Sequence, residues 1–297
     1  MTGPAAMLCV RSYAKINLYL DVLNKRRDGY HNIETIFQTV SLHDDLHLEA
    51  QETALALSCS NPDLPVDETN LVLRAARLLR EKSGAAVGAR FQLEKRIPVA
   101  AGLAGGSGNA AAALLGLNTL WKLAWPLERL SLLACELGAD VPYCLRGGTM
   151  AGAERGEQLT PLPALPETWF VLVHPPLRVS SASVYHHELL TYKTELPVNG
   201  RTPSFDTILK TLEQGNIAGI VFNKMEVPVF AQHPELAAIK AQLIRLGCAA
   251  AAMSGSGPTL FGLCRERAQA EDIAGQLGPW NSSVVRSVPE GVEFLES

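Results

Sequence analysis

One stretch of the chain, residues 97–112, constrains the fold more than any other. It reads IPVAAGLAGGSGNAAA and holds four glycines between positions 102 and 108. The residues before it, 91–97, predict a strand, and the Ala- and Leu-rich residues after it, to about Leu123, predict a helix. We expect Ser107 or Asn109 to cap that helix. The sequence therefore predicts a strand, a glycine loop and a helix in series.

A glycine loop that leads into a helix is suited to binding an anion. Glycine lets the backbone approach a ligand closely, and the helix N-terminus offers unpaired N–H groups and the positive end of its dipole. The loop is not a Walker loop, because the chain contains no Gly-Lys pair, and it lacks the G-x-G-x-x-G spacing. We expect phosphate as its ligand. A connector that binds nothing is the alternative.

A second stretch rich in Gly and Ser, SGSGPT at residues 254–259, lies between predicted strands at 249–253 and 259–264. Taken alone, it is typical of a hairpin turn without a ligand. Both glycine-containing stretches lie in charge-free segments, 97–121 and 246–264, but their glycine and hydroxyl content is not that of a membrane span. Together the two loops are suited to clasping a polyphosphate.

The first predicted strand carries polar residues on one face that could take part in chemistry. Residues 8–23 alternate, with Ile16 and Leu18 on one face and Lys15 and Asn17 on the other, which predicts a half-buried strand. A lysine in a partly dry cleft polarises a hydroxyl or holds phosphate, whereas a solvated lysine on an open face is the alternative. Asp140, in LGADVP, is either a helix-start residue or a carboxylate that accepts a hydroxyl proton beside Lys15.

The rest of the chain predicts an α+β fold of two domains. A turn at Asp28-Gly29 returns the chain as a second strand over residues 30–40. Helices are expected at 127–138 and 234–246, and a strand at 169–174. The Pro-rich segment 159–166 is the best domain boundary, which gives domains of residues 1–162 and 163–297.

Composition narrows the classes of function. The length of 297 residues suits roughly two domains, and 47% apolar with 19% charged residues excludes a disordered chain. The net charge of −4 and the lack of a basic block argue against nucleic acid as a partner. Six scattered cysteines without paired spacing predict neither zinc nor a disulfide framework, and residues 1–15 do not predict a secretory signal. We expect a cytoplasmic protein without a membrane partner.

At this point the motifs resemble those of a known family. Lys15 in SYAKIN, the glycine-rich run 97–112 and SGSGPT at 254–259 are similar to the three motifs of the GHMP kinases, which include galactokinase and the homoserine, mevalonate and phosphomevalonate kinases. Further segments, among them DGYHNIETIFQ, ETNLVLRAA and LGADVP, resemble the branch of the family whose substrate is 4-diphosphocytidyl-2-C-methyl-D-erythritol. The similarity runs in order along nearly the whole chain.

The resemblance implies a first domain like ribosomal protein S5 domain 2, a ferredoxin-like second domain, and a site between them. It implies phosphorylation of the substrate's 2-hydroxyl by ATP, on the non-mevalonate route to isopentenyl diphosphate, with Asp140 as general base and Lys15 as its electrostatic partner. Mg²⁺ would be bound through ATP, with Ser107 as the candidate side-chain ligand. The protein is expected to be a monomer or a weak homodimer.

The same resemblance assigns binding residues. The implied ATP-binding residues are Pro98, Val99, Ala100, Ala101, Gly102, Leu103, Ala104, Gly105, Gly106, Ser107, Gly108 and Asn109, with Asn70 and Lys95 near the adenosine. The implied substrate-binding residues are Asn17, Tyr30, His31, Ser181, Tyr185, Gly255, Ser256, Gly257 and Thr259. Among them, His31 would bind the edge of the cytosine and Tyr185 would stack on it. From the sequence alone, a histidine after a turn is more typical of a surface or packing residue.

One position departs from the family pattern, because Ser107 is followed by Gly108 where a second serine is usual. If that hydroxyl normally contacts a phosphate or the metal, its loss weakens ATP binding or leaves a water in its place.

The sequence leaves two other functions open. One is a related kinase acting on mevalonate or homoserine, which needs no cytidine pocket. The other is a catalytically silent nucleotide-binding module, which the presence of both Lys15 and Asp140 disfavours.

Overall fold

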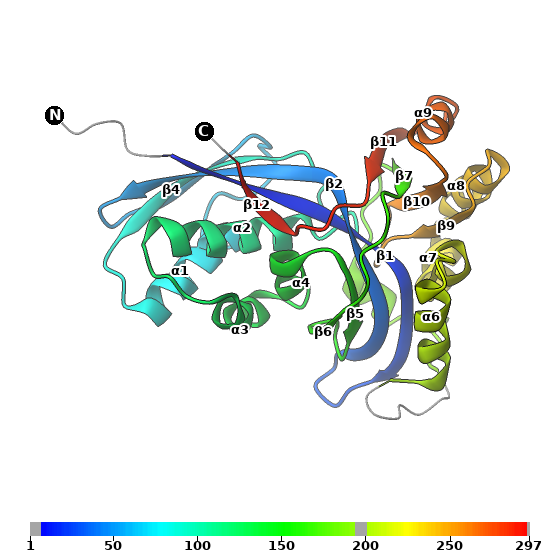
Figure 1. The fold of residues 1–297 in the computed structure, drawn as a ribbon, viewed down its shortest axis with the longest axis horizontal. Coiled ribbons are helices and arrows are strands. Elements are labelled where there is room, and N and C mark those ends of the chain that lie inside the picture. Colours follow the sequence, from blue (N-terminus) through cyan, green and yellow to red (C-terminus); the bar gives the residue numbers. More distant parts are fainter. Residues whose placement is uncertain (1–6, 194–200, 296–297) are drawn as a thin grey trace.

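Two β-sheets organise the protein, and each carries helices on one face (Figure 1). The computed structural model describes residues 7–193 and 201–295. The combination confirms the predicted α+β class. Within those ranges, no helix has the length and apolar character needed to cross a membrane.

The first sheet is built around two long antiparallel strands. They are β1 (Leu8–Lys25) and β2 (His31–Gln51), joined by the predicted turn at Asp28-Gly29. β4 (Gly88–Glu94) pairs antiparallel with β2, and β3 (Leu55–Cys59) pairs parallel with β4. The strands β5 (Thr149–Ala153) and β6 (Gln158–Pro161) extend the sheet from β2.

Four helices cover one face of this sheet. They are α1 (Leu71–Ser83), α2 (Gly105–Leu120), α3 (Leu127–Leu137) and α4 (Val141–Arg146). α2 is apolar on all sides, as expected for a helix buried on all sides, and it lies between the sheet and the other three helices. Its alanines, buried at positions 110–113, let neighbouring helices and strands approach closely.

The second sheet has four antiparallel strands in the order β11, β7, β10, β9. These are β11 (Asn281–Arg286), β7 (Trp169–His174), β10 (Leu260–Cys264) and β9 (Ala250–Met253). Side chains alternate between its faces. Val171 and Val173 pack with α8 (Pro234–Arg245) and α9 (Arg267–Gly275), whereas Phe170 and Leu172 face the first sheet.

The remaining elements connect the two sheets. They are α5 (Ser181–Tyr185), α6 (Pro203–Glu213), a 3-10 turn at Ala218–Ile220, β8 (Phe222–Asn223), α7 (Glu226–Gln232) and β12 (Val292–Leu295). β8 pairs parallel with β1, and β12 pairs antiparallel with it, so late segments of the chain join the first sheet. The division at 162/163 remains a prediction.

The structure corrects several sequence predictions about strands. β2 continues past Val40 to Gln51, because a register shift between Tyr13 and Ala14 of β1 accommodates Ser41 and Leu42 as a bulge and pairing resumes at His43. β4 ends at Glu94 rather than at Ile97. β1 is buried on both faces and not half-buried, since Lys15 is only 4% exposed. Part of the predicted connector forms β6, an edge strand, where a terminal proline is tolerated.

The prediction of a side-chain cap on α2 is also wrong. The helix begins at Gly105, so Ser107 and Asn109 both lie inside its first turns. Its N-cap is Ala104, in a left-handed conformation with φ +56°, and no side chain caps it. The physical reason is that the backbone conformation of the glycine loop sets where the helix begins. No side chain is needed there, and the N-terminal N–H groups of the helix stay uncapped.

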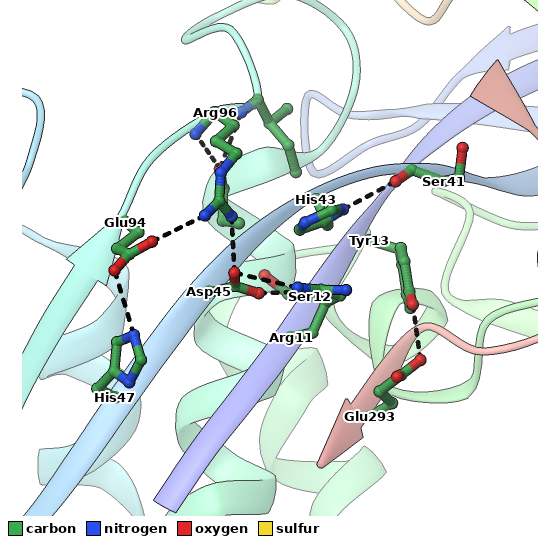
Figure 2. Close-up of polar contacts among 12 residues, drawn as sticks. Arg11, Ser12, Tyr13, Ser41, His43, Asp45, His47, Glu94, Arg96 and Glu293 are labelled. Atoms are coloured by element: carbon green, nitrogen blue, oxygen red, sulfur yellow. Dashed lines mark hydrogen bonds and ion pairs between the residues drawn. The ribbon is translucent and has the colours of Figure 1, made fainter. Parts of the chain in front are cut away.

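The face of the first sheet opposite the helices carries a chain of charged contacts (Figure 2). The Asp45 carboxylate accepts hydrogen bonds from Arg11, at 2.8 Å, and from Arg96, at 2.7 Å. Arg96 also contacts Glu94, which in turn lies 3.4 Å from His47. Because side chains alternate along a strand, the neighbouring Asp44 points to the opposite face, toward α2.

Candidate active site

A single large cavity contains most of the residues singled out from the sequence. Its volume is about 1130 Å³, large enough for two small-molecule ligands side by side. The first glycine loop and the start of α2 line it beside Lys15, whose N–H donates to the Leu103 carbonyl. Tyr30, His31 and Tyr185 line it further along the hairpin, since His31 pairs with Lys25, ten residues beyond Lys15 on β1. Lys15 and Asp140 also line the cavity.

The first glycine loop leaves the N-terminus of α2 open toward this cavity. The first hydrogen bond of the helix runs from the Gly108 N–H to the Ala104 carbonyl, at 2.8 Å. The N–H groups of Gly105, Gly106 and Ser107 precede that bond and so have no partner within the helix. All three residues line the cavity. This is the geometry of an anion site, which favours the phosphate interpretation over a connector that binds nothing.

A buried carboxylate that the sequence analysis missed holds this loop in place through hydrogen bonds. Asp44 accepts hydrogen bonds from the backbone N–H groups of Arg96 and Ile97, at 2.7 and 2.8 Å. Its other oxygen accepts from Lys95 Nζ, at 2.6 Å, and from Asn109 Nδ2, at 2.9 Å. Asp44 is fully buried. It therefore fixes both ends of the glycine loop, and it explains why β4 ends before residue 95.

Three residues predicted to bind ATP thus have structural partners. Lys95 pairs with Asp44, and burial lowers its pKa while that carboxylate acts in the opposite direction. Asn109 donates to Ser12 as well as to Asp44. Asn70 caps α1, because its Oδ1 accepts from the Val72 N–H at 3.0 Å. All three predicted residues still line the cavity, so their contact with ATP stays a prediction.

The second glycine loop packs directly on the first. The Ser254 hydroxyl donates to the Gly102 carbonyl at 2.9 Å, and the Thr259 N–H points to the Ala101 carbonyl at 3.4 Å. Gly102 has φ +76°, and a Cβ added there would overlap the Ser254 carbonyl oxygen. Only glycine fits this approach. The loops lie together, as the sequence predicted for a clasp.

Lys15, Asn17 and Asp140 meet where the two loops converge. Lys15 Nζ donates to Asn17 Oδ1 at 2.7 Å and lies 3.8 Å from Asp140 Oδ2. Asn17 donates in turn to Thr35 Oγ1, at 2.8 Å, so its amide is fixed. The Lys15 ammonium is buried and also lies 5.5 Å from the centre of the Phe37 ring. The alternative of a solvated lysine is therefore excluded.

Asp140 keeps its carboxylate available for chemistry. It precedes α4 as the N-cap residue, but its side chain makes no capping hydrogen bond. Its side chain is 36% exposed, whereas that of Lys15 is 5% exposed. The helix-start interpretation of this aspartate thus explains its position in the chain but not its side chain. A carboxylate next to a buried ammonium, on the wall of a cavity, has the position that a general base requires.

Aromatic rings form the far end of the cavity. His31 stacks on Tyr185, with ring centres 4.8 Å apart and an angle of 16° between the rings. Its Nε2 lies 3.1 Å from the Tyr192 hydroxyl, a contact that the sequence analysis missed. Burial, Lys25 and His186 lower the pKa of His31, which keeps the ring neutral near pH 7. Tyr30 is exposed beside them.

A few predicted residues lie away from the cavity wall. Thr259 is buried, and its hydroxyl contacts His174. Neither Thr259 nor Gly257 lines the cavity, whereas Gly255 and Ser256 do. Ser181 lines it as well and shares a hydrogen bond of 2.7 Å with Ser256.

Gly108 faces β1, because a Cβ there would first meet Ser12 at 3.4 Å. That direction does not support a phosphate contact at position 108.

Two family models match separate parts of this chain. Residues 70–148 match the GHMP kinases N terminal domain, and residues 201–279 match the GHMP kinases C terminal domain. Proteins of Bacillus cereus (strain AH187) and Bacillus anthracis named 4-diphosphocytidyl-2-C-methyl-D-erythritol kinase are 45% identical to it over 260 residues, covering 86% of this chain and 88% of theirs. The chain belongs to the GHMP kinase family.

Solved structures of other kinases resemble this one. A crystal structure of 4-(cytidine 5'-diphospho)-2C-methyl-D-erythritol kinase has a TM-score of 0.79 and 36% identity, covering 93% of this chain and 98% of that one. A mevalonate kinase of L. major has a TM-score of 0.70 at 16% identity, covering 97% of each chain. The second likeness shows a shared fold and nothing finer.

Proposed function

We propose that this GHMP kinase transfers the γ-phosphoryl group of ATP to the 2-hydroxyl of 4-diphosphocytidyl-2-C-methyl-D-erythritol. One observation carries the proposal. The buried Lys15 and the partly exposed Asp140 lie between an open helix N-terminus and an aromatic pocket, within one cavity. A phosphate donor and an acceptor with a planar base at its far end fit this order. The names of the 45% identical relatives support the same substrate.

The side chains suggest how the transfer proceeds. Asp140 takes the proton of the substrate's 2-hydroxyl while the hydroxyl oxygen attacks the γ-phosphorus of ATP. The bond between that phosphorus and the bridging oxygen breaks, and ADP leaves. Lys15 stabilises the negative charge that develops on the attacking oxygen, because a buried ammonium acts through a low dielectric. Asn17, hydrogen-bonded to Lys15, keeps the ammonium in place and offers its fixed amide to the methylerythritol part.

ATP would be held through its phosphates at the first glycine loop. The unpaired N–H groups of Gly105, Gly106 and Ser107 are the donors that support this placement. Mg²⁺ prefers oxygen ligands and is usually shared with substrate phosphates. Among the described residues, no cluster of three or more His, Cys, Asp or Glu side chains forms a metal site. The Ser107 hydroxyl, at the open helix N-terminus, is the side-chain oxygen that would hold the ion, which would neutralise charge on the phosphates.

The cytidine would occupy the aromatic end. His31 and Tyr185 stack on each other here, so a cytosine that stacks on Tyr185 and meets His31 with its edge would enter from the side of the pair and displace one ring from the other. The neutral His31 ring has one donor and one acceptor nitrogen, which suits the edge of a cytosine. We retain Tyr30, Ser181, Gly255 and Ser256 as substrate contacts. A monomeric or weakly dimeric state in the cytoplasm stays a prediction.

The test is ADP release by the purified protein with ATP and Mg²⁺. Three acceptors are compared at equal concentration: 4-diphosphocytidyl-2-C-methyl-D-erythritol, mevalonate and homoserine. We expect turnover with the first alone. Turnover with mevalonate or homoserine, but not with the cytidine compound, would replace the proposal with a related kinase. ATP binding without turnover of any acceptor would replace it with a nucleotide-binding module.

A further inference from the structure

One buried amide holds the second glycine loop in place, and it belongs to neither loop. Asn223, at the end of β8, is 2% exposed. Its Nδ2 donates to the carbonyl oxygens of Met253, at 2.6 Å, and Gly255, at 2.7 Å. Its Oδ1 accepts from the Met225 N–H at 2.9 Å, so the orientation of the amide is fixed. An amide is suited to this task because one nitrogen offers two donors.

A second side chain of the same segment completes the support. Glu226 Oε1 accepts from the Met253 N–H at 2.8 Å, and its other oxygen binds Lys240 at 2.5 Å. The backbone of Met253 is therefore held at both its N–H and its carbonyl. The segment is itself tied to β1, since Phe222 pairs with Tyr19 and the Lys224 N–H donates to the Leu20 carbonyl at 2.8 Å. We call residues 223–226 the loop clamp.

The clamped loop lies next to the catalytic lysine. A Cβ added at Gly255 would lie 3.4 Å from Lys15 Nζ and 3.5 Å from Asn17 Oδ1, so the space between the loop backbone and these two side chains is about the size of one methyl group. Gly255 and Ser256 also line the cavity. The Asn223 nitrogen hydrogen-bonds to carbonyl oxygens of this loop. It therefore leaves the N–H groups of the loop free for other partners. Within residues 7–193 and 201–295, the N–H groups of Gly255 and Ser256 have no hydrogen-bond partner.

We propose that Asn223 is a positioning residue for phosphoryl transfer. Through the loop clamp, it fixes Gly255 against Lys15 and Asn17 and keeps the adjacent N–H groups directed at the reacting phosphoryl group. The inference rests on the proposed function and adds a residue to it. Asn223 does not line the cavity, so its effect falls on the rate of the chemical step more than on ATP binding.

The test compares two asparagines with similar surroundings. Asn118 is 9% exposed, donates to the Trp125 carbonyl at 3.1 Å and accepts from the Trp125 N–H at 3.0 Å, away from the cavity. Asn223→Asp and Asn118→Asp each keep an acceptor and lose donors to backbone carbonyls. We expect Asn223→Asp to lower kcat on the order of tenfold or more with the ATP KM changed less than about threefold. Asn118→Asp should lower the melting temperature and leave kcat within about twofold.

The readouts separate this inference from the proposed function. Turnover by the wild-type protein on the three acceptors decides the function, and the ratio of variant to wild-type kcat on the acceptor it uses decides the inference. If Asn223→Asp does not fold, Asn223→Ser replaces it, because one hydroxyl can still bond one of the two carbonyls. An unchanged kcat in a folded Asn223 variant, or an equal fall in Asn118→Asp, would overturn the positioning role.

Discussion

The two glycine loops of the active site are supported in opposite ways. The first is fixed by a carboxylate, Asp44, which accepts hydrogen bonds from the backbone N–H groups of residues 96 and 97, just before the loop begins. The second is fixed by an amide, Asn223, which donates to backbone carbonyls within and beside the loop. A carboxylate can bind only donors, whereas an amide can bind carbonyls.

The difference shows how each loop keeps its own N–H groups for a ligand. Asp44 binds N–H groups outside the anion site and leaves those of Gly105, Gly106 and Ser107 open at the helix N-terminus. The Asn223 nitrogen binds only carbonyls of this loop, and the N–H groups of Gly255 and Ser256 stay without a hydrogen-bond partner among the described residues. The first support should therefore govern ATP binding and the second the rate of transfer. The predictions below test this division.

The largest effect is expected at Asp44. In Asp44→Asn, an amide nitrogen replaces the oxygen that accepts from Lys95 and Asn109, so donors face donors around a buried ammonium. Removing one partner of a buried ion pair costs about 3–5 kcal/mol of unfolding free energy. We expect a loss in that range by urea unfolding, together with a raised ATP KM. Asp45→Asn is the matched control, since its side chain points to the opposite face (Figure 2). An unchanged ATP KM in folded Asp44→Asn would show that the loop does not depend on this carboxylate.

The contact between the loops is tested at Gly102. Gly102→Ala adds a Cβ that would overlap the Ser254 carbonyl oxygen, at a residue with φ +76°. Gly84→Ala is the control, because Gly84 has φ +69° and nothing within 4 Å of such a Cβ. Left-handed strain alone costs about 1–2 kcal/mol, so Gly84→Ala should lose that much stability and no activity. We expect Gly102→Ala to lose more and to lower kcat. Equal losses in both variants would mean that the loops tolerate separation.

A smaller, pH-dependent effect is expected at Asp45. Burial raises the pKa of this carboxyl, but hydrogen bonds from Arg11 and Arg96 outweigh it and bring the pKa to about 2. A lowered pKa stabilises the folded state above the ordinary carboxyl range, and this stabilisation is lost as the pH falls toward 2. Both arginines are partly exposed, so Asp45→Asn should cost about 1 kcal/mol at pH 7. The gap in unfolding free energy should shrink at pH 3; a constant gap would contradict the assignment.

The smallest effect is expected at Gly108. The sequence suggested that a serine there would improve ATP binding, but a Cβ at this position faces Ser12 and the Tyr13 carbonyl. We now expect the ATP KM of Gly108→Ser to stay within about twofold of the wild-type value. A marked fall in that KM would restore the original interpretation, in which the missing hydroxyl contacts a phosphate or the metal.

The sequence predicted the loops and the polar pair but not what holds them. Lys15 and the glycines are recognisable because their chemistry is local: alternation places Lys15 beside Asn17, and glycine density marks a loop. Asp44 and Asn223 act on backbone 53 and 30 residues away in the chain, as in the bonds to Ile97 and Met253. No local pattern separates them from surface residues. The predicted start of α2 was wrong for a related reason, since the backbone of the loop, and no side chain, sets where this helix begins.

The most direct test of the account is the rate of the chemical step in Asp140→Asn. The variant keeps the shape of the side chain but removes the carboxylate that lies 3.8 Å from Lys15. Single-turnover phosphoryl transfer to 4-diphosphocytidyl-2-C-methyl-D-erythritol should fall by about 10²–10⁴-fold, as expected for loss of a general base, with ATP binding unchanged. A wild-type rate of transfer in this variant would contradict the assignment of Asp140 as the base.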